Sequence, residues 1–214
     1  MKADSREESS RKVWDREYTR QPRLWKGPAC SPFLPRGESV LELGCGGGKT
    51  LKALLDEGRE VVAIDFSSAA VKSCATAAGA CGQLHLLVAK AEHLPFSDSS
   101  FRTVVASHII GHLLADERRL AAAEAYRVLA PGGVLHVQEF SCKDLRAKKG
   151  KKVEDGTVTK GTGVRTHFFE EEELKQLFAA FEARRIYRIE STKSYRGEDV
   201  LRSEIVAEFR RPVE

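Results

Sequence analysis

The chain has 214 residues, of which 42% are hydrophobic and 31% are charged, and its formal net charge is +4. This length fits one domain or one domain with a modest extension, and the apolar content is enough for a packed core. No apolar run approaches the roughly 20 residues of a membrane-spanning helix, and the first ten residues lack the apolar stretch of a secretion signal. We therefore expect a cytoplasmic protein that does not bind membranes.

Residues 1–38 are predicted to form an N-terminal arm or lid that lies outside the regular pattern of the rest. Aromatic residues alternate here with basic ones: Trp14, Tyr18 and Trp25 are interleaved with Arg11, Lys12, Arg16, Arg20, Arg23 and Lys26. One interpretation is an amphipathic lid helix that packs its aromatic side chains over a ligand cleft. The other is an arm that stacks RNA bases on these aromatic rings.

Residues 40–49, VLELGCGGGK, are typical of a short buried strand that runs through a glycine-rich turn into a helix. A second apolar run, residues 61–65, ends at Asp65. Glycines allow a ligand to approach the backbone, and a carboxylate one βα unit later can accept two hydroxyl hydrogen bonds. The pattern predicts a site for an adenosine-containing ligand, with Asp65 on the ribose and Phe66 beside the adenine. A tight glycine turn without a ligand is the alternative.

The residues around the turn distinguish between adenosine ligands. Lys49 occupies the position of the third glycine in a dinucleotide fingerprint, and Glu42 stands two residues before Gly44. A carboxylate there would repel a pyrophosphate but could accept a hydrogen bond from an ammonium group. S-adenosylmethionine (SAM) carries an ammonium group and no phosphate. The segment resembles the first motif of the class I SAM-dependent methyltransferases, E/D-x-G-x-G-x-G, which its residues match at Glu42, Gly44, Gly46 and Gly48.

Apolar runs alternate with helical periodicity along residues 39–214, which form the predicted methyltransferase domain. Strands are expected at 40–43, 61–65, 84–88, 101–107, 134–139, 185–189 and 205–209, and helices at 49–57, 68–78, 116–129 and 170–181. This order predicts an α/β fold, a Rossmann-like three-layer sandwich with a seven-stranded, mostly parallel sheet. The last two strands are expected to pair antiparallel at one edge. Residues 127–133, RVLAPGG, resemble a further hallmark of the class and are interpreted as a structural turn.

The resemblance implies further cofactor contacts. Residues 91–96, AEHLPF, are similar to the third motif of the class, so the backbone amide of Ala91 and the side chain of Glu92 are expected at the adenine edge. Ser107, at the end of the fourth strand, matches the position that contacts the methionine part of SAM. Cys45 lies inside the glycine turn, where a small side chain fits.

Two histidines, His108 and His112, follow the fourth strand and are four residues apart. One helical turn would place them on a common face, but spacing suggests no third metal ligand. The five cysteines (Cys30, Cys45, Cys74, Cys81 and Cys142) include no C-x-x-C pair. We therefore expect no bound metal and no disulfide framework. His112 is a candidate hydrogen-bonding partner or weak base toward the acceptor, and His108 a candidate substrate contact; both are otherwise ordinary residues of the cleft wall.

Residues 141–166 are rich in Lys, Gly and Thr and lack apolar periodicity, which is typical of a functional or disordered linker. Its basic run is either a solvated loop or a surface that contacts phosphates. Residues 161–169, GTGVRTHFF, resemble a segment of the tRNA 3-methylcytidine methyltransferases, as does W-D-x-x-Y at residues 14–18. This weaker resemblance implies that Trp14, Tyr18, Arg165 and His167 contact substrate.

We expect direct, in-line methyl transfer from SAM to a nucleophilic acceptor, with a tRNA base as the predicted substrate. A small-molecule methyltransferase is the alternative, in which the same segments form a lid over a compact acceptor. A further alternative is a non-catalytic SAM-binding subunit. SAM and S-adenosylhomocysteine are the expected ligands and RNA the expected partner.

Overall fold

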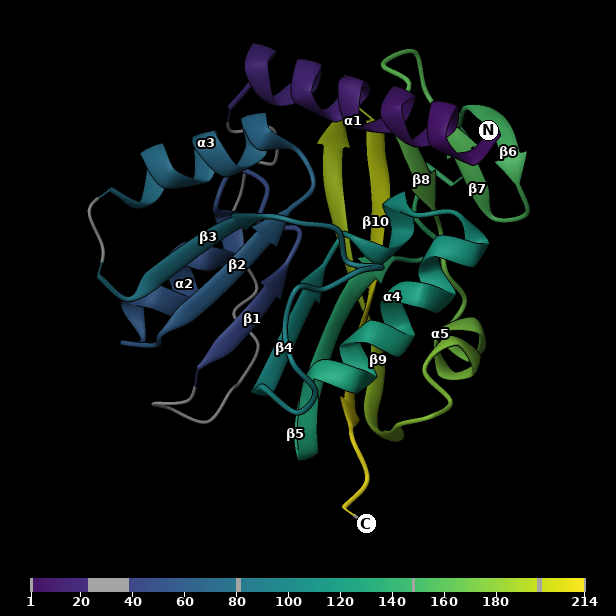
Figure 1. The fold of residues 1–214 in the computed structure, drawn as a ribbon. Coiled ribbons are helices and arrows are strands. Elements are labelled where there is room, and N and C mark those ends of the chain that lie inside the picture. Colours follow the sequence, from purple (N-terminus) through teal and green to yellow (C-terminus); the bar gives the residue numbers. More distant parts are fainter. Residues whose placement is uncertain (1, 23–38, 80–81, 148, 196–197, 214) are drawn as a thin grey trace.

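The computed structural model describes residues 2–22, 39–79, 82–147, 149–195 and 198–213. Trp25 and the other residues of the arm between 23 and 38 lie outside this part, as do Cys30 and Cys81. In chain order the elements are α1 Lys2–Arg20, β1 Val40–Leu43, α2 Lys49–Asp56, β2 Val61–Asp65, α3 Ser68–Ala78, β3 Leu84–Val88, β4 Phe101–Ser107, the 3-10 turn η1 Ile110–His112, α4 Ala115–Val128, β5 Leu129–Phe140, β6 Lys151–Glu154, β7 Thr157–Thr159, β8 Arg165–His167, α5 Glu171–Leu177, β9 Glu182–Tyr195 and β10 Glu198–Arg210. Figure 1 shows their arrangement.

The main sheet has seven strands in the order β3-β2-β1-β4-β5-β10-β9. Strands β1 to β5 pair in parallel, and β10 runs antiparallel to both β5 and β9. The predicted Rossmann-like sheet and its antiparallel edge pair are confirmed. The order in which strands are added to the sheet reverses between β1 and β4: β2 and β3 lie on one side of β1, and β4 and β5 lie on the other. In open sheets of this kind, ligands bind in the crevice at the carboxyl ends of the strands beside this reversal.

Two apolar clusters hold the layers together, one on each face of the sheet. On one face, Leu41 and Val104 pack with α4 and α5, including Leu174. On the other face, Val105 packs with α2, including Leu54. Neighbouring residues of β4 thus enter opposite cores, as the two-residue period of a strand requires. The sheet is the central layer of the predicted three-layer sandwich.

The segment between β5 and α5 differs from the expected linker, because residues 151–167 form a second, three-stranded antiparallel sheet. The side chains of Lys151, Lys152 and Val153 are exposed, so backbone pairing with β7 orders this strand rather than apolar burial. Glu154 attaches the sheet to α4 by an ion pair with Arg118, at 2.8 Å. An apolar pattern therefore could not reveal these strands.

Several boundaries also differ from the prediction. Helix α5 ends at Leu177 rather than at 181, and β9 and β10 are much longer than expected. The two long strands pair with each other along almost their whole length, so backbone hydrogen bonds extend them beyond their apolar residues. Ser67 caps α3, because its Oγ accepts a hydrogen bond from the Ala70 amide at 3.1 Å. Within the described ranges, no helix is both long and apolar enough to cross a membrane.

Candidate active site

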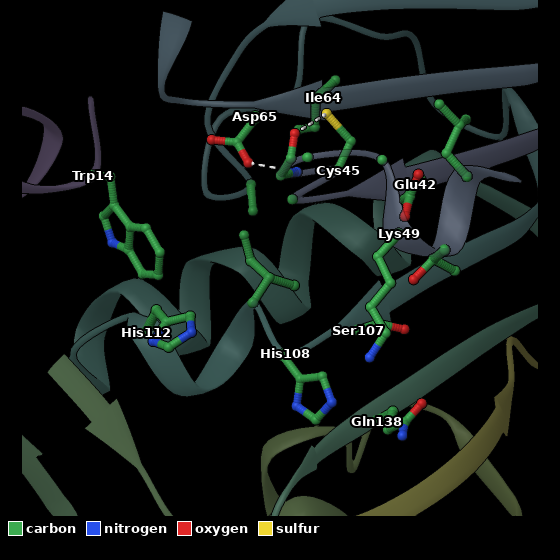
Figure 2. A pocket seen from close by; sticks show the side chains of 18 of the residues that line it. Trp14, Glu42, Cys45, Lys49, Ile64, Asp65, Ser107, His108, His112 and Gln138 are labelled. Carbon is green, nitrogen blue, oxygen red and sulfur yellow. Dashed lines mark hydrogen bonds between the residues drawn. The ribbon is translucent and has the colours of Figure 1, made fainter. Parts of the chain in front are cut away.

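A cavity of about 1270 Å³ lies at the carboxyl ends of β1, β2 and β4, with α1 on one side (Figure 2). It is lined by all the predicted cofactor residues, namely Glu42, Gly44, Cys45, Gly46, Gly48, Asp65, Phe66, Ala91, Glu92 and Ser107. Five predicted substrate or catalytic residues also line it: Trp14, Tyr18, His108, His112 and Arg165. The structure thus brings two distant regions of the chain to one cavity.

The glycine turn has a backbone that only glycine adopts easily. Gly44, Gly46 and Gly48 have φ values of 71°, 52° and 79°. A methyl group added to Gly46 would collide with the Tyr18 hydroxyl oxygen, and one on Gly44 would approach Ile109 to 2.9 Å. Close packing of α1 and of the segment after β4 on this backbone therefore depends on the glycines.

Asp65 joins the turns that follow β1 and β2. Its Oδ2 accepts a hydrogen bond from the Gly46 amide at 3.0 Å, and its Oδ1 accepts one from the Ser67 amide at 2.9 Å. Burial raises the pKa of Asp65 to about 6, although the two amides oppose the shift. Each carboxylate oxygen has a further lone pair, so Asp65 can also accept hydrogen bonds from a diol in the cavity.

Glu42 is almost fully buried, and its Oε2 has no hydrogen-bond partner among the described residues. Burial, with a smaller contribution from the Asp65 charge, raises the pKa of Glu42 to about 8; a hydrogen bond with Thr50 opposes this shift. A buried carboxyl oxygen without a partner is costly unless a ligand satisfies it. The glycine turn, the diol acceptor Asp65 and the ammonium acceptor Glu42 together fit SAM.

The cysteine of the turn is a structural residue. Cys45 is buried and packs with Cys74 of α3 in the core under the turn. A hydrogen bond with Cys74, together with burial, raises the pKa of the Cys45 thiol. The thiol therefore remains protonated and contributes its small volume rather than reactivity.

The W-D-x-x-Y residues of α1 fix this helix over the cavity, where Figure 2 shows Trp14 facing His112. Asp15 Oδ1 accepts hydrogen bonds from the Ser67 hydroxyl at 2.6 Å and from the Ala69 amide at 3.2 Å, at the N-terminus of α3. The Trp14 ring stacks on Tyr18, with centroids 5.8 Å apart, and meets the His112 ring edge-on at 4.7 Å. Each of the three residues thus connects α1 to a different wall of the cavity.

Arg165 connects the other end of the cavity to α1 and α4. Its Nη2 donates a hydrogen bond to the Ser10 hydroxyl at 3.1 Å and lies 3.9 Å from a carboxylate oxygen of Glu117. Its backbone carbonyl lies 2.6 Å from Nδ1 of His112. Because a carbonyl oxygen can only accept, the proton of a neutral His112 must be on Nδ1.

Both histidines of the cavity wall are neutral near pH 7. Burial lowers the pKa of His112 to about 4. Burial, followed by repulsion from nearby cations, lowers the pKa of His108 to about 3. His108 has a left-handed backbone, with φ 55°, and its buried Nδ1 has no hydrogen-bond partner among the described residues. Such strain at a non-glycine residue is typical of functional sites.

His167 does not line the cavity, and the structure revises its predicted substrate contact. The side chain is buried, with Nδ1 2.8 Å from the Thr157 hydroxyl and Nε2 2.7 Å from a carboxylate oxygen of Glu173. Nδ1 therefore bonds within the small sheet, to β7, and Nε2 connects that sheet to α5. Arg165 and His167 lie two residues apart on one face of β8, and only Arg165 reaches the cavity.

One wall of the cavity, formed by β5, β10 and the segment between β5 and β6, was not predicted from the sequence. Its members are Gln138, Phe140, Arg146, Arg202 and Glu204. The Gln138 amide donates a hydrogen bond to Glu204 Oε2 at 2.6 Å. Gln138 pairs in register with Ser107, so its place at the end of the fifth predicted strand was a usable signal. Arg202 and Glu204 reach the cavity only because β10 runs antiparallel beside β5.

Residues 41–137 match the family model described as a methyltransferase domain. The tRNA N(3)-methylcytidine methyltransferase Mettl2 of Drosophila melanogaster is 31% identical over 179 residues, which are 74% of this chain and 52% of that protein. O-methyltransferase 3 of Dictyostelium discoideum is 30% identical over 155 residues, or 66% of this chain and 36% of that protein. The chain therefore spans about half the length, or less, of these curated relatives.

Solved structures show the same architecture. A SAM-dependent methyltransferase of Methanosarcina mazei is 27% identical with a TM-score of 0.70, and the match covers 85% of this chain and 96% of that one. A methyltransferase of Haloferax volcanii, solved in complex with the activator Trm112, is 18% identical with a TM-score of 0.68 over 99% and 96% of the two chains. At 18% identity, the likeness to the Haloferax volcanii protein concerns the fold alone.

The sheet order and the cavity at its reversal define a Rossmann-like protein built to hold SAM. With the sequence likenesses, they place the chain in the class I SAM-dependent methyltransferases. Within that class, it has a weaker resemblance to the tRNA 3-methylcytidine methyltransferases.

Proposed function

We propose that this chain transfers the methyl group of SAM to a base of tRNA. The observation that carries the proposal is the continuity of the cavity from Glu42 and Asp65 to the polar wall that contains Gln138, Arg146 and Arg202. Its volume of about 1270 Å³ exceeds the roughly 300–1,000 Å³ of an ordinary small-molecule pocket. The space therefore suits a cofactor together with a planar acceptor. The resemblance to tRNA cytidine methyltransferases supports RNA as the acceptor.

SAM, when bound, supplies the electrophilic methyl group, so the protein needs mainly to bind, orient and exclude water. In this proposal Asp65 accepts hydrogen bonds from the ribose hydroxyls and Glu42 accepts one from the ammonium group. Phe66, Ala91 and Glu92 line the adenine end, and Ser107 the methionine end. Residues 1–38 are the proposed lid, and α1 is the helix of that lid. It shields the reaction from water through Trp14 and Tyr18.

His112 is the proposed positioning group for the acceptor. Its proton is on Nδ1, which faces the Arg165 carbonyl, and the lowered pKa keeps the ring neutral near pH 7. A neutral imidazole orients an acceptor by hydrogen bonding and is only a weak base. His108, Trp14, Tyr18 and Arg165 are the proposed walls of the acceptor space.

A small-molecule methyltransferase is the second candidate. The burial of Trp14 and Tyr18 favours it, because a closed lid suits a compact acceptor, and so does the likeness to O-methyltransferase 3. A non-catalytic SAM-binding subunit is a further alternative. A cytoplasmic location remains a prediction, which cell fractionation tests.

Radiolabelled SAM distinguishes these functions when total tRNA and a metabolite extract are offered in parallel at low and moderate salt. We expect label in tRNA, reduced as salt rises because RNA binding releases counterions. The label should disappear with Asp65→Ala. Label only in metabolites would replace the proposal with the second candidate. Bound SAM without transfer to either pool would contradict both and support the non-catalytic subunit.

A further inference from the structure

A buried carboxylate, Asp144, holds two arginines at the acceptor end of the cavity. Its Oδ1 accepts hydrogen bonds from the Arg146 amide at 3.0 Å and from Arg146 Nε at 2.7 Å. Its Oδ2 accepts hydrogen bonds from Arg146 Nη2 at 3.1 Å, from Arg202 Nε at 2.9 Å and from the Ser203 amide at 3.1 Å. These contacts keep the pKa of Asp144 low, at about 2, against the effect of burial.

The two arginines are fixed in place but remain accessible. Their side chains are 18% and 25% exposed, and both line the cavity. The guanidinium carbon of Arg146 lies 3.8 Å from the centroid of the Phe140 ring, on which His108 stacks at 4.2 Å. Among the described residues, no hydrogen bond uses Nη1 of Arg146 or either Nη of Arg202. Donors thus remain for a ligand at this wall.

Positive charge exceeds negative charge around Asp144. The pKa of Lys160 is lowered by burial and by the cations Arg146, Lys149 and Arg202, while Asp144 opposes the shift. Asp144 therefore faces four cations, and Glu204, the other carboxylate of this wall, accepts a hydrogen bond from Gln138. Lys193 extends the basic surface, because it lines the cavity and is exposed on the strand that pairs with β10.

We propose that Arg146 and Arg202, held by Asp144, form a subsite for a phosphodiester group of the RNA acceptor, next to the nucleotide that enters the cavity. This inference rests on the proposed function. Guanidinium groups in a fixed orientation suit phosphate oxygens, because their planar N–H donors form paired hydrogen bonds. A chain of phosphates can continue from this subsite toward Lys193, whereas a single small anion needs only the two arginines.

Fluorescence anisotropy with end-labelled total tRNA tests the subsite without SAM. Binding is measured from about 50 to 200 mM salt for the intact chain and for Arg202→Gln, Arg202→Lys, Arg146→Gln and Arg119→Gln. Arg119 is an exposed arginine of α4 outside the cavity lining, so its variant loses the same charge elsewhere. Each lost phosphate contact should lower the slope of log affinity against log salt by roughly 0.7–1.

We expect this lower slope for Arg202→Gln and Arg146→Gln, and an unchanged slope for Arg119→Gln. Arg202→Lys should keep the slope because it keeps the charge. A merely structural role would weaken binding in Arg202→Gln and Arg202→Lys alike, which would overturn the proposal. The two glutamine variants could instead show the same slope as the intact chain while the intact chain still methylates tRNA. That result would overturn the subsite but leave the proposed function standing. No binding or methylation of tRNA by the intact chain would overturn the proposed function as well.

Discussion

The two ends of the cavity differ in charge and in how the chain builds them. At the β1 and β2 end, the carboxyl groups Glu42 and Asp65 are buried and have raised pKa values. At the β5 and β10 end, Arg146 and Arg202 surround one buried carboxylate, and neutral His108 lies nearby. The first end suits a cationic cofactor once Glu42 has lost its proton, and the second end suits an anionic acceptor. A protein can separate the two ligands by charge within one cavity because buried charges are weakly screened.

The ends also differ in the origin of their rigidity. Asp65 bonds to amides of its own turn and of the neighbouring turn, so local backbone geometry orients the carboxylate. Asp144 instead joins a segment after β5 to β10, 58 residues further along the chain. Substitutions at the first end should therefore change cofactor affinity, and substitutions at the second should change acceptor affinity.

The largest expected effect is that of Asp65→Ala on the cofactor end. Loss of two hydrogen bonds to a charged acceptor should cost about 3 kcal/mol, or roughly a hundredfold in SAM affinity. Isothermal titration calorimetry measures this change, and circular dichroism checks the fold, because Asp65 also accepts two backbone amides. Asp65→Asn is the matched control that keeps the shape. SAM affinity within threefold of the original in Asp65→Ala would refute the assignment.

Gly46→Ala tests the contact between the turn and α1. The new methyl group would meet the Tyr18 hydroxyl, and the φ of 52° strains any other residue. Beyond that strain, we expect the crowding to cost about 2 kcal/mol, which is roughly thirtyfold in SAM affinity if α1 must move.

Gly58→Ala supplies the control for Gly46→Ala. Gly58 has a φ of 74° but no atom within 4 Å of an added methyl group, so it reports backbone strain alone, about 1–2 kcal/mol. Thermal unfolding compares the two variants, and titration with SAM separates stability from affinity. Equal losses of stability, with unchanged SAM affinity in both, would show that α1 does not press on the turn.

The pH dependence of SAM binding tests Glu42. Its pKa of about 8 means that the carboxyl is mostly protonated at pH 6–7 and must lose that proton to accept an ammonium group. SAM affinity should therefore rise with pH up to about 8, by at most about tenfold per pH unit. Glu42→Gln should remove this rise while leaving the contributions of other groups. A parallel pH profile in the variant would contradict the assignment of Glu42 to the ammonium group.

Asp15→Ala should have the smallest effect, because it loosens the lid without touching the cofactor contacts. Its carboxylate stabilises the N-terminus of α3 and bonds the Ser67 hydroxyl, which together are worth about 1 kcal/mol. We expect SAM to dissociate roughly fivefold faster and protease to cleave α1 sooner. Stopped-flow displacement measures the rate, with Asp15→Asn as the control that keeps an acceptor. An unchanged dissociation rate would show that α1 is not a lid.

The comparison of the two ends also explains which residues the sequence could predict. The residues of the first end lie on or directly after apolar runs, so strand periodicity and the glycine turn locate them in the chain. Burial of Glu42 and the contacts of Asp65 follow from that local pattern. His167 shows the limit, because a resemblance identified the segment but not how far along β8 the cavity reaches. The small sheet β6–β8 shows another, since backbone pairing orders it without an apolar pattern.

The sequence by itself determined the sheet, the glycine turn and the residues expected to hold SAM, because these depend on local periodicity and backbone conformation. Only the tertiary structure decided the acceptor end. Asp144, Arg202 and Glu204 meet there because β10 inserts antiparallel between β5 and β9. The attachment of α1 to α3 through Asp15 is likewise a contact across 52 residues. Such pairings depend on the order of strands and the docking of helices, which no short stretch of sequence encodes.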